Sequence, residues 1–284
     1  MNSQNELVSI GLPVYNGMPS VKKAIESVLA QTYPNIELII SDNPSTDGTQ
    51  ALCEEYARRD KRVRYIRHKD NIGAIGNYNF AFKESKGEYF FWVSYDDFLD
   101  PHLVEECAAL LRKDKEAAMA MSDFAHVNMR GEVTHKMNPE DFVVRERDLY
   151  SRLKHFILMD WGGGKAMTIH GLWRRTVIEG DEYRDLPDGD INFSFRGLSR
   201  GPFLFVNKVL FYKGVLPGGE SRIDEPLTSG RMLSALITRL KLIQTHALSM
   251  KYAAGIHGLS YAARLKLIFW NCVVVARMFL RRKL

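Results

Sequence analysis

The chain has 284 residues, of which 45% are hydrophobic and 26% charged, and this composition is that of a folded globular protein. It excludes a disordered chain, a collagen-like chain and an acidic tail protein. The length fits one large domain with a smaller addition, since single hydrophobic cores stop growing at about 250 to 300 residues. Three scattered cysteines, without CxxC or zinc spacing, indicate neither a disulfide framework nor a zinc site and favour a reducing cytosol.

Charge is distributed unevenly along the chain. The formal net charge is +5, yet no acid follows Glu225, and the last 59 residues carry ten basic side chains. Residues 1–225 carry 29 basic and 34 acidic side chains, a balance of −5. We therefore predict two units, a catalytic domain over residues 1–225 and a basic extension over 226–284. The polar N-terminus, MNSQNELVSI, does not have the pattern of a signal peptide.

Apolar runs and helical repeats alternate through the first 110 residues. The pattern predicts helices from Val21 to Leu29, over 50–59 and over 77–83, and strands over residues 7–14, 37–41, 63–66 and 89–93. Strands that alternate with helices are typical of βαβ units. The fold class we predict is therefore α/β, with a mostly parallel sheet flanked by helices.

The rest of the chain is less regular. Further strand is expected over residues 117–135, a helix over 145–159, a flexible loop at Gly162–Gly164, and a strand over 202–212. From about residue 227 the pattern becomes helical.

The last segment, residues 265–284, is apolar but interrupted by Asn271 and Arg277. Its longest uncharged run, 267–276, is too short to cross a bilayer, which takes about 20 apolar residues. We expect an amphipathic helix that lies at a membrane surface, with Phe269 and Trp270 at the apolar boundary. The alternative is a basic helical hairpin that packs on the domain or on a second subunit.

Three polar clusters follow predicted strands: Pro13 to Asn16, Asp42 with Asn43, and Asp96 with Asp97. Ligands of open α/β sheets bind outside the carboxyl ends of the strands, so the clusters can line one pocket. Each cluster alone is typical of an ordinary turn or helix cap, and the coincidence of three is the stronger signal. Two adjacent carboxylates after an apolar strand repel each other unless a proton or a cation intervenes. We expect Mg²⁺ or Mn²⁺ there, completed by water and a phosphate.

Several stretches of sequence resemble, in order, the conserved blocks of family 2 glycosyltransferases with the GT-A fold, of the bacterial surface-polysaccharide type. They are VSIGLPVYNG, AIESVLAQTYPNIELIISDNPSTDGT, NIGAIGNYNFAF, GEYFFWVSYDDFLDP and GDINFSFRGLSRG. The resemblance covers about residues 7–215 and says little about the tail.

The resemblance implies a nucleotide-sugar site in the first half of the chain. In this site Asp42 accepts a hydrogen bond from the base, and Asn43 stands where many relatives have a second Asp. The residues implied are Pro13, Tyr15, Asn16, Asp42, Asn43, Asn71, Gly73, Asn77 and Asp96. Asp96 and Asp97 match the DxD-type metal motif, but Ser94 replaces its first acid, so which Asp binds the metal stays open.

The resemblance also implies a catalytic base. Asp190 matches it, while Gly189 replaces the acid that often precedes it, and Asp188 is the fallback. Apolar residues at helical spacing after Asp190 predict that it begins an amphipathic helix. Without the resemblance, Asp190 would be read as an N-cap. His170 and Trp173 fall in a segment that resembles the acceptor floor of relatives; the alternative is that they belong to the core.

These features together predict an inverting glycosyltransferase. It would use a UDP- or dTDP-sugar and Mn²⁺ or Mg²⁺, with a glycan or lipid-linked acceptor presented at the cytoplasmic leaflet of the membrane. No nucleic acid partner is expected, and a homodimer stays open. A sugar-1-phosphate nucleotidyltransferase would need a glycine-rich basic loop that PVYNGMPS lacks. A non-catalytic membrane or nucleic-acid adaptor is the other alternative, since the tail could bind phosphates without chemistry.

Overall fold

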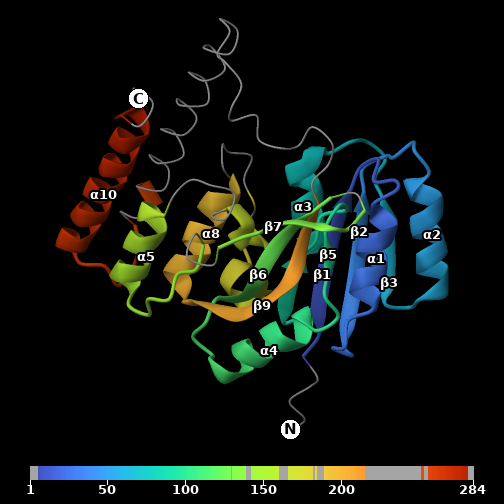
Figure 1. Ribbon diagram of the computed structural model, residues 1–284, viewed down its shortest axis with the longest axis horizontal. Helices are drawn as coiled ribbons and strands as arrows, with labels where there is room; N and C mark the ends of the chain where they lie inside the picture. The colour runs from blue at the N-terminus through green and yellow to red at the C-terminus, as the bar shows by residue number, and fades with distance from the viewer. Residues whose placement is uncertain are drawn as a thin grey trace, which may run out of the picture.

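The computed structural model describes residues 6–128, 130–138, 142–159, 166–181, 183, 189–214, 251–252 and 255–280. A twisted central sheet runs through the molecule, with helices packed against it (Figure 1). The strand order is β3-β2-β1-β4-β8-β6-β9-β5, and β7 pairs with β6 off this path.

The first half of the chain forms a parallel sheet of β1 (Val8–Val14), β2 (Ile36–Asp42), β3 (Val63–Arg67) and β4 (Tyr89–Trp92). The connections are α1 (Val21–Leu29), α2 (Thr49–Arg59) and α3 (Gly73–Lys83). Every residue of β1 is buried, as expected for a strand covered on both faces. The strands predicted here are confirmed, and α3 begins four residues earlier than predicted.

The second half of the sheet is mixed. β8 (Leu172–Arg174) runs antiparallel to β4 and to β6 (Met119–Val127), and β9 (Phe203–Gly214) runs parallel to β6. The edge pieces β5 (Phe98–Leu99) and β7 (Val133–Lys136) are antiparallel to β9 and β6. The further strand expected over 117–135 is divided into two, β6 and β7, because the chain turns back at Asn128, whose N–H donates to the Glu132 carbonyl at 3.0 Å.

Helices of the second half complete the layers. They are α4 (Leu103–Lys113), α5 (Leu149–Leu158), the short 3₁₀ helix η2 (Met167–His170), α7 (Arg175–Ile178), α8 (Gly189–Arg200) and α10 (Tyr261–Leu280). Figure 1 shows α10 beside α5, at the opposite end of the molecule from α2. Within the described residues no helix is both long and apolar enough to cross a membrane. The boundary predicted near residue 225 and the glycine loop at 162–164 lie outside the described residues.

Aromatic side chains form the part of the core that links the two halves. Trp92 of β4 packs edge-on against Phe193 of α8 at 5.4 Å between ring centroids, and Phe193 packs against Trp173 of β8 at 5.2 Å. Edge-to-face pairs of this kind add to the free energy gained by burial. The start of α8 is thereby fixed to the strand that leads into Asp96 and Asp97.

Candidate functional site

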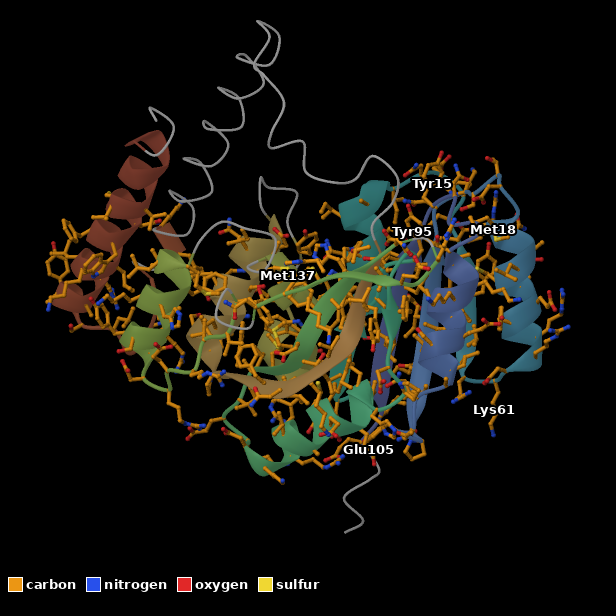
Figure 2. The ribbon with its side chains drawn as sticks, viewed as in Figure 1. Tyr15, Met18, Lys61, Tyr95, Glu105 and Met137 are labelled. Carbon is orange, nitrogen blue, oxygen red and sulfur yellow. The ribbon has the colours of Figure 1, made fainter. Side chains whose placement is uncertain are left out.

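A cavity of about 320 Å³ lies at the carboxyl ends of β1, β2 and β4 and beside the start of α3. It brings together residues predicted for the nucleotide-sugar site: Pro13, Tyr15, Asn43, Asn71, Gly73, Asn77 and Asp96. The other lining residues were not among those implied for the nucleotide-sugar site: Val14, Ala74, Tyr78, Ser94 and Tyr95. Figure 2 shows Tyr15 and Tyr95 at this end of the sheet, with Lys61 and Glu105 at the opposite end.

Asp42 is buried and does not line this cavity. Its carboxylate accepts hydrogen bonds from the Tyr65 hydroxyl at 2.6 Å and the Ser45 hydroxyl at 2.5 Å, and the residue is fully buried. This position differs from the expected contact with a nucleobase. Asp42 instead holds Ser45, whose hydroxyl also accepts from the Asn16 backbone N–H at 2.9 Å.

Asn16 also supports the loop without lining the cavity. Its φ of 50° lies in the left-handed region, which Asn tolerates better than most residues. Its Oδ1 accepts from the Thr46 N–H at 2.9 Å. Asn16 therefore joins the loop after β1 to the loop after β2, and so places Tyr15 at the cavity wall.

Asn77 shows why α3 borders the cavity. Its side chain is buried, donates to the Val14 carbonyl at 3.1 Å and accepts from the Ser41 hydroxyl. One amide thus satisfies a strand-end carbonyl and a hydroxyl at once, which fixes the first turns of α3 against β1 and β2.

The two adjacent acids have different surroundings. Asp96 lines the cavity, whereas the Asp97 side chain is fully buried and faces Lys213 of β9. The Lys213 Nζ lies 3.1 Å from Oδ1 of Asp97, and the Gly214 N–H donates to the same oxygen at 3.0 Å. Which of the two acids meets a metal was left open by the sequence, and of this pair the structure presents Asp96, and not Asp97, to the cavity.

Electrostatics explain how the pair is tolerated. Burial raises the pKa of Asp96, and the neighbouring Asp97 raises it further. Burial alone would lower the pKa of Lys213, but the Asp97 and Asp96 carboxylates outweigh burial and raise it, so the ammonium stays charged. Lys213 thus places a positive charge beside the acid pair, although burial still keeps the pKa of Asp97 above its usual value. Neither Lys213 nor Gly214 was found from sequence, because their only signal is a Lys-Gly pair at a strand end.

The residues present still fit a metal ion bound together with a diphosphate. Within the part of the chain that the structure describes, no group of three His, Cys, Asp or Glu side chains could hold a metal. Mg²⁺, however, is commonly held by one or two carboxylates, with water and substrate phosphates as its other ligands. Asp96, at the wall of a cavity large enough for such phosphates, meets this requirement.

Asp190 is the second residue of α8, which begins one residue before the predicted start, and its Oδ1 accepts from the Ile191 N–H at 2.8 Å. The apolar face of the helix is buried, as expected: Ile191, Phe195 and Leu198. Asp188, the fallback base, lies outside the described residues.

Aromatic contacts connect the start of α8 to the cavity. Tyr183 packs 5.9 Å from Tyr78, a cavity residue, and 6.2 Å from Phe193, which lies one turn along α8 from Asp190. These contacts link α8 to one wall of the cavity, although Asp190 does not itself line the cavity.

The two residues expected to meet an acceptor both pack within the protein. Trp173 is completely buried, its indole N–H donates to the Ile169 carbonyl at 3.0 Å, and it forms part of the core instead of an acceptor floor. His170 is half-buried, stacks on Phe211 and donates from Nδ1 to the Trp92 carbonyl at 3.2 Å. Burial, with a smaller effect of Lys213, lowers the pKa of His170 to about 3, so this imidazole is neutral.

Comparison with known proteins is consistent with this geometry. The profile of "Glycosyl transferase family 2" matches residues 9–174. An uncharacterized glycosyltransferase of Rickettsia typhi is 33% identical over 83% of this chain and 70% of its own length. Chondroitin synthase of Escherichia coli is 29% identical over 77% of this chain, but the match spans only 30% of that enzyme.

Solved structures show the same fold. TarS of Staphylococcus aureus, residues 1–349 with UDP-GlcNAc, superposes with a TM-score of 0.68 at 18% identity, covering 92% of this chain and 70% of that one. A mannosyltransferase of Pyrobaculum calidifontis with GDP-Man and Mn²⁺ has a TM-score of 0.54 at 13% identity, covering 94% and 80%. At these identities the likeness shows the fold alone. The profile match and the Rickettsia typhi relative place the chain in glycosyl transferase family 2, and its fold is GT-A.

Proposed function

We propose that the protein transfers a sugar from a UDP- or dTDP-linked donor to a hydroxyl of a glycan or lipid-linked acceptor, with inversion at the anomeric carbon. The observation that carries the proposal is the cavity at the strand ends, where the residues implied for a nucleotide sugar meet Asp96. Family membership supports it, and TarS, a protein of the same fold, binds UDP-GlcNAc.

In this proposal the residues of the cavity walls position the donor. Tyr15 and Pro13 border the end of β1 and contact the nucleoside, while Asn71 and Gly73, at the start of α3, line the path of the diphosphate and sugar. Asp96 would hold Mn²⁺ or Mg²⁺ together with the diphosphate. When bound, such a cation neutralises the diphosphate and stabilises it as a leaving group.

Asp190 is the proposed base. The acceptor oxygen forms a bond to the anomeric carbon as the bond from that carbon to the diphosphate oxygen breaks on the opposite face. The hydroxyl proton passes to a carboxylate oxygen of Asp190, and the nucleoside diphosphate leaves. A carboxylate at a helix N-terminus is held in its ionised form, so it accepts the proton late, when the acceptor hydroxyl has become acidic.

We further propose that α10 holds the enzyme at the cytoplasmic face of a membrane, where lipid-linked intermediates of bacterial surface polysaccharides are presented. Support comes from one face of this helix, on which Tyr261, Leu265 and Phe269 are 76, 48 and 59% exposed. Their spacing of four residues places them on one face of α10, and the basic composition of the tail suits anionic headgroups. A homodimer that buries the same face is the competing proposal.

The decisive experiment combines donor binding with transfer. Isothermal titration with UDP, dTDP and their sugars, with and without Mn²⁺, identifies the donor class. Asp190→Asn should keep donor binding while transfer falls by about 10² to 10⁴-fold, the usual contribution of a general base. Asp188→Asn is the matched control, and a loss confined to that variant would move the base to Asp188. No binding of any UDP or dTDP compound would refute the donor assignment.

A further inference from the structure

The end of β9 contacts the loop that carries Asp96 and Asp97. Lys213 and Gly214 are more than a hundred residues away in sequence, yet both contact this loop. The Lys213 Nζ lies 3.1 and 3.2 Å from the two carboxylate oxygens of Asp97, and the Gly214 N–H donates to one of them. Asp97 is therefore held from the strand on which Lys213 and Gly214 lie.

The ion pair is buried on the acid side. The Asp97 side chain is 0% exposed, whereas that of Lys213 is 27% exposed. A buried carboxylate without its cation is strongly destabilising, because neither water nor another charge replaces the lost partner. The position of Asp97 therefore depends on Lys213.

A backbone contact fixes Asp96 as well. A Cβ on Gly214 would lie 2.0 Å from the carbonyl oxygen of Asp96 and 2.9 Å from its carbonyl carbon. Only glycine allows this approach, because both atoms belong to the backbone and cannot rotate away. The main chain at Asp96 is thus pressed against the end of β9, while its side chain lines the cavity.

We propose that Lys213 and Gly214 form a positioning clamp for the donor site, in which they engage Asp97 fully and hold Asp96 as the single carboxylate presented to the cation and diphosphate. The proposal rests on the proposed function. It assigns Asp97 a supporting role and makes Lys213 a residue on which the affinity for metal and nucleotide depends, although Lys213 does not itself line the cavity.

Binding of UDP and of dTDP in Mn²⁺, measured by isothermal titration on the full chain, tests the clamp. Lys213→Met should weaken this binding at least about tenfold, and Lys213→Arg should recover part of it, since it restores the charge. Asp97→Asn combined with Lys213→Met should bind more tightly than Lys213→Met alone, because the double variant leaves no unpaired buried charge. Gly214→Ala should weaken binding with both charges still present.

Lys208→Met is the matched control. Lys208 lies on the same strand and pairs with Glu106 at 2.5 Å, but its side chain is 60% exposed and far from the cavity residues in the strand register. Its removal should leave nucleotide binding unchanged.

Two other results for Lys213→Met would overturn the clamp. Tighter Mn²⁺-dependent binding by Lys213→Met would show that Lys213 competes with the metal for Asp97, which overturns the clamp. Unchanged binding with only a lower Tm would reduce Lys213 to a structural residue and overturn it too. If Lys213→Met does not fold, nucleotide binding by Lys213→Arg and Gly214→Ala still tests the clamp. Wild-type protein that binds neither nucleotide would instead overturn the proposed function.

Discussion

Asn43 donates a hydrogen bond from Nδ2 to the carbonyl oxygen of Gly73 at 3.2 Å, and its Oδ1 accepts from the adjacent Ile72 N–H at 3.1 Å. The end of β2 is thereby tied to the start of α3, and both Asn43 and Gly73 line the cavity. The contact needs a donor and an acceptor in one side chain. An amide supplies both, whereas a carboxylate only accepts.

Asn43→Asp should therefore weaken nucleotide binding, although it restores the acid that many relatives carry there. The variant keeps the bond from Ile72 but loses the donated bond and turns a carboxylate toward the Gly73 carbonyl. Loss of such a hydrogen bond costs about 1 to 2 kcal/mol, and the part of this cost that nucleotide binding must repay to order the site sets the loss of affinity, at most about 5- to 30-fold. Titration calorimetry with UDP measures the change.

Asn71→Asp is the control for added negative charge at the same cavity. The Oδ1 of Asn71 accepts a hydrogen bond from the Gly73 N–H at 2.8 Å, and a carboxylate oxygen of aspartate accepts the same bond. If both variants lose affinity equally, charge and not the amide geometry explains the loss.

Gly197→Ala should destabilise the protein although alanine is the better helix former. A Cβ at this position of α8 would lie 2.2 Å from the Trp173 ring. Overpacking of this kind costs about 1 to 3 kcal/mol, more than the roughly 1 kcal/mol gained in helix propensity. Thermal unfolding should show a lower Tm.

The double variant Gly197→Ala with Trp173→Phe tests the cause of that change. The clashing atoms belong to the outer ring of the indole, which phenylalanine lacks. The added methyl should cost less in this background, and an equal cost in both backgrounds would contradict the steric explanation.

His170 should make the protein less stable in mild acid. Its pKa is lowered to about 3 by burial, while in the unfolded chain a histidine titrates near about 6.5. As the pH falls below about 6.5, His170 takes up a proton in the unfolded chain but stays neutral in the folded protein. Stability should therefore decline by up to about 1.4 kcal/mol per pH unit from this group, until the pH approaches 3.

His170→Asn removes this titration while it keeps a donor for the Trp92 carbonyl. Urea unfolding at pH 7 and pH 5 should show a smaller loss of stability for the variant than for the wild type. His257→Asn, at an exposed position, is the control and should retain the wild-type difference. The same pH dependence in all three proteins would exclude His170 as the source.

Serine at Tyr261, Leu265 and Phe269 together should abolish flotation with anionic vesicles. The opposite face of α10, with Leu267 and Asn271 buried, remains intact, so the helix should still pack on α5. Val133→Ser, which removes a 48% exposed apolar residue from β7, is the control. Unchanged flotation would remove the role of this face, and a change from dimer to monomer in light scattering would assign it to a subunit interface.

Much of the site could be predicted from the sequence because strand ends are local features. Pro13, Asn43 and Asp96 follow apolar runs directly, and parallel strands carry such ends to one edge of the sheet. Asp42 follows the same rule but is buried, and the hydroxyls of Tyr65 on the neighbouring strand and of Ser45 in the next loop donate to its oxygens. Sequence position fixes the edge on which a residue lies, but not which of its neighbours its side chain meets.

The amino-acid order by itself determined the alternation of strands and helices, the place of Asp190 in the first turn of α8 and the family resemblance, because periodicity and short motifs are encoded within a few residues of each other. Only the tertiary structure decided which acid faces the cavity. The partner of Asp97 comes from β9, and the contact of Lys213 with Asp97 depends on how β5 and β9 pair, a register that no local pattern reveals. Trp173 was likewise placed in the core by the packing of α8 on β8, since a buried indole and an exposed one have the same sequence signal.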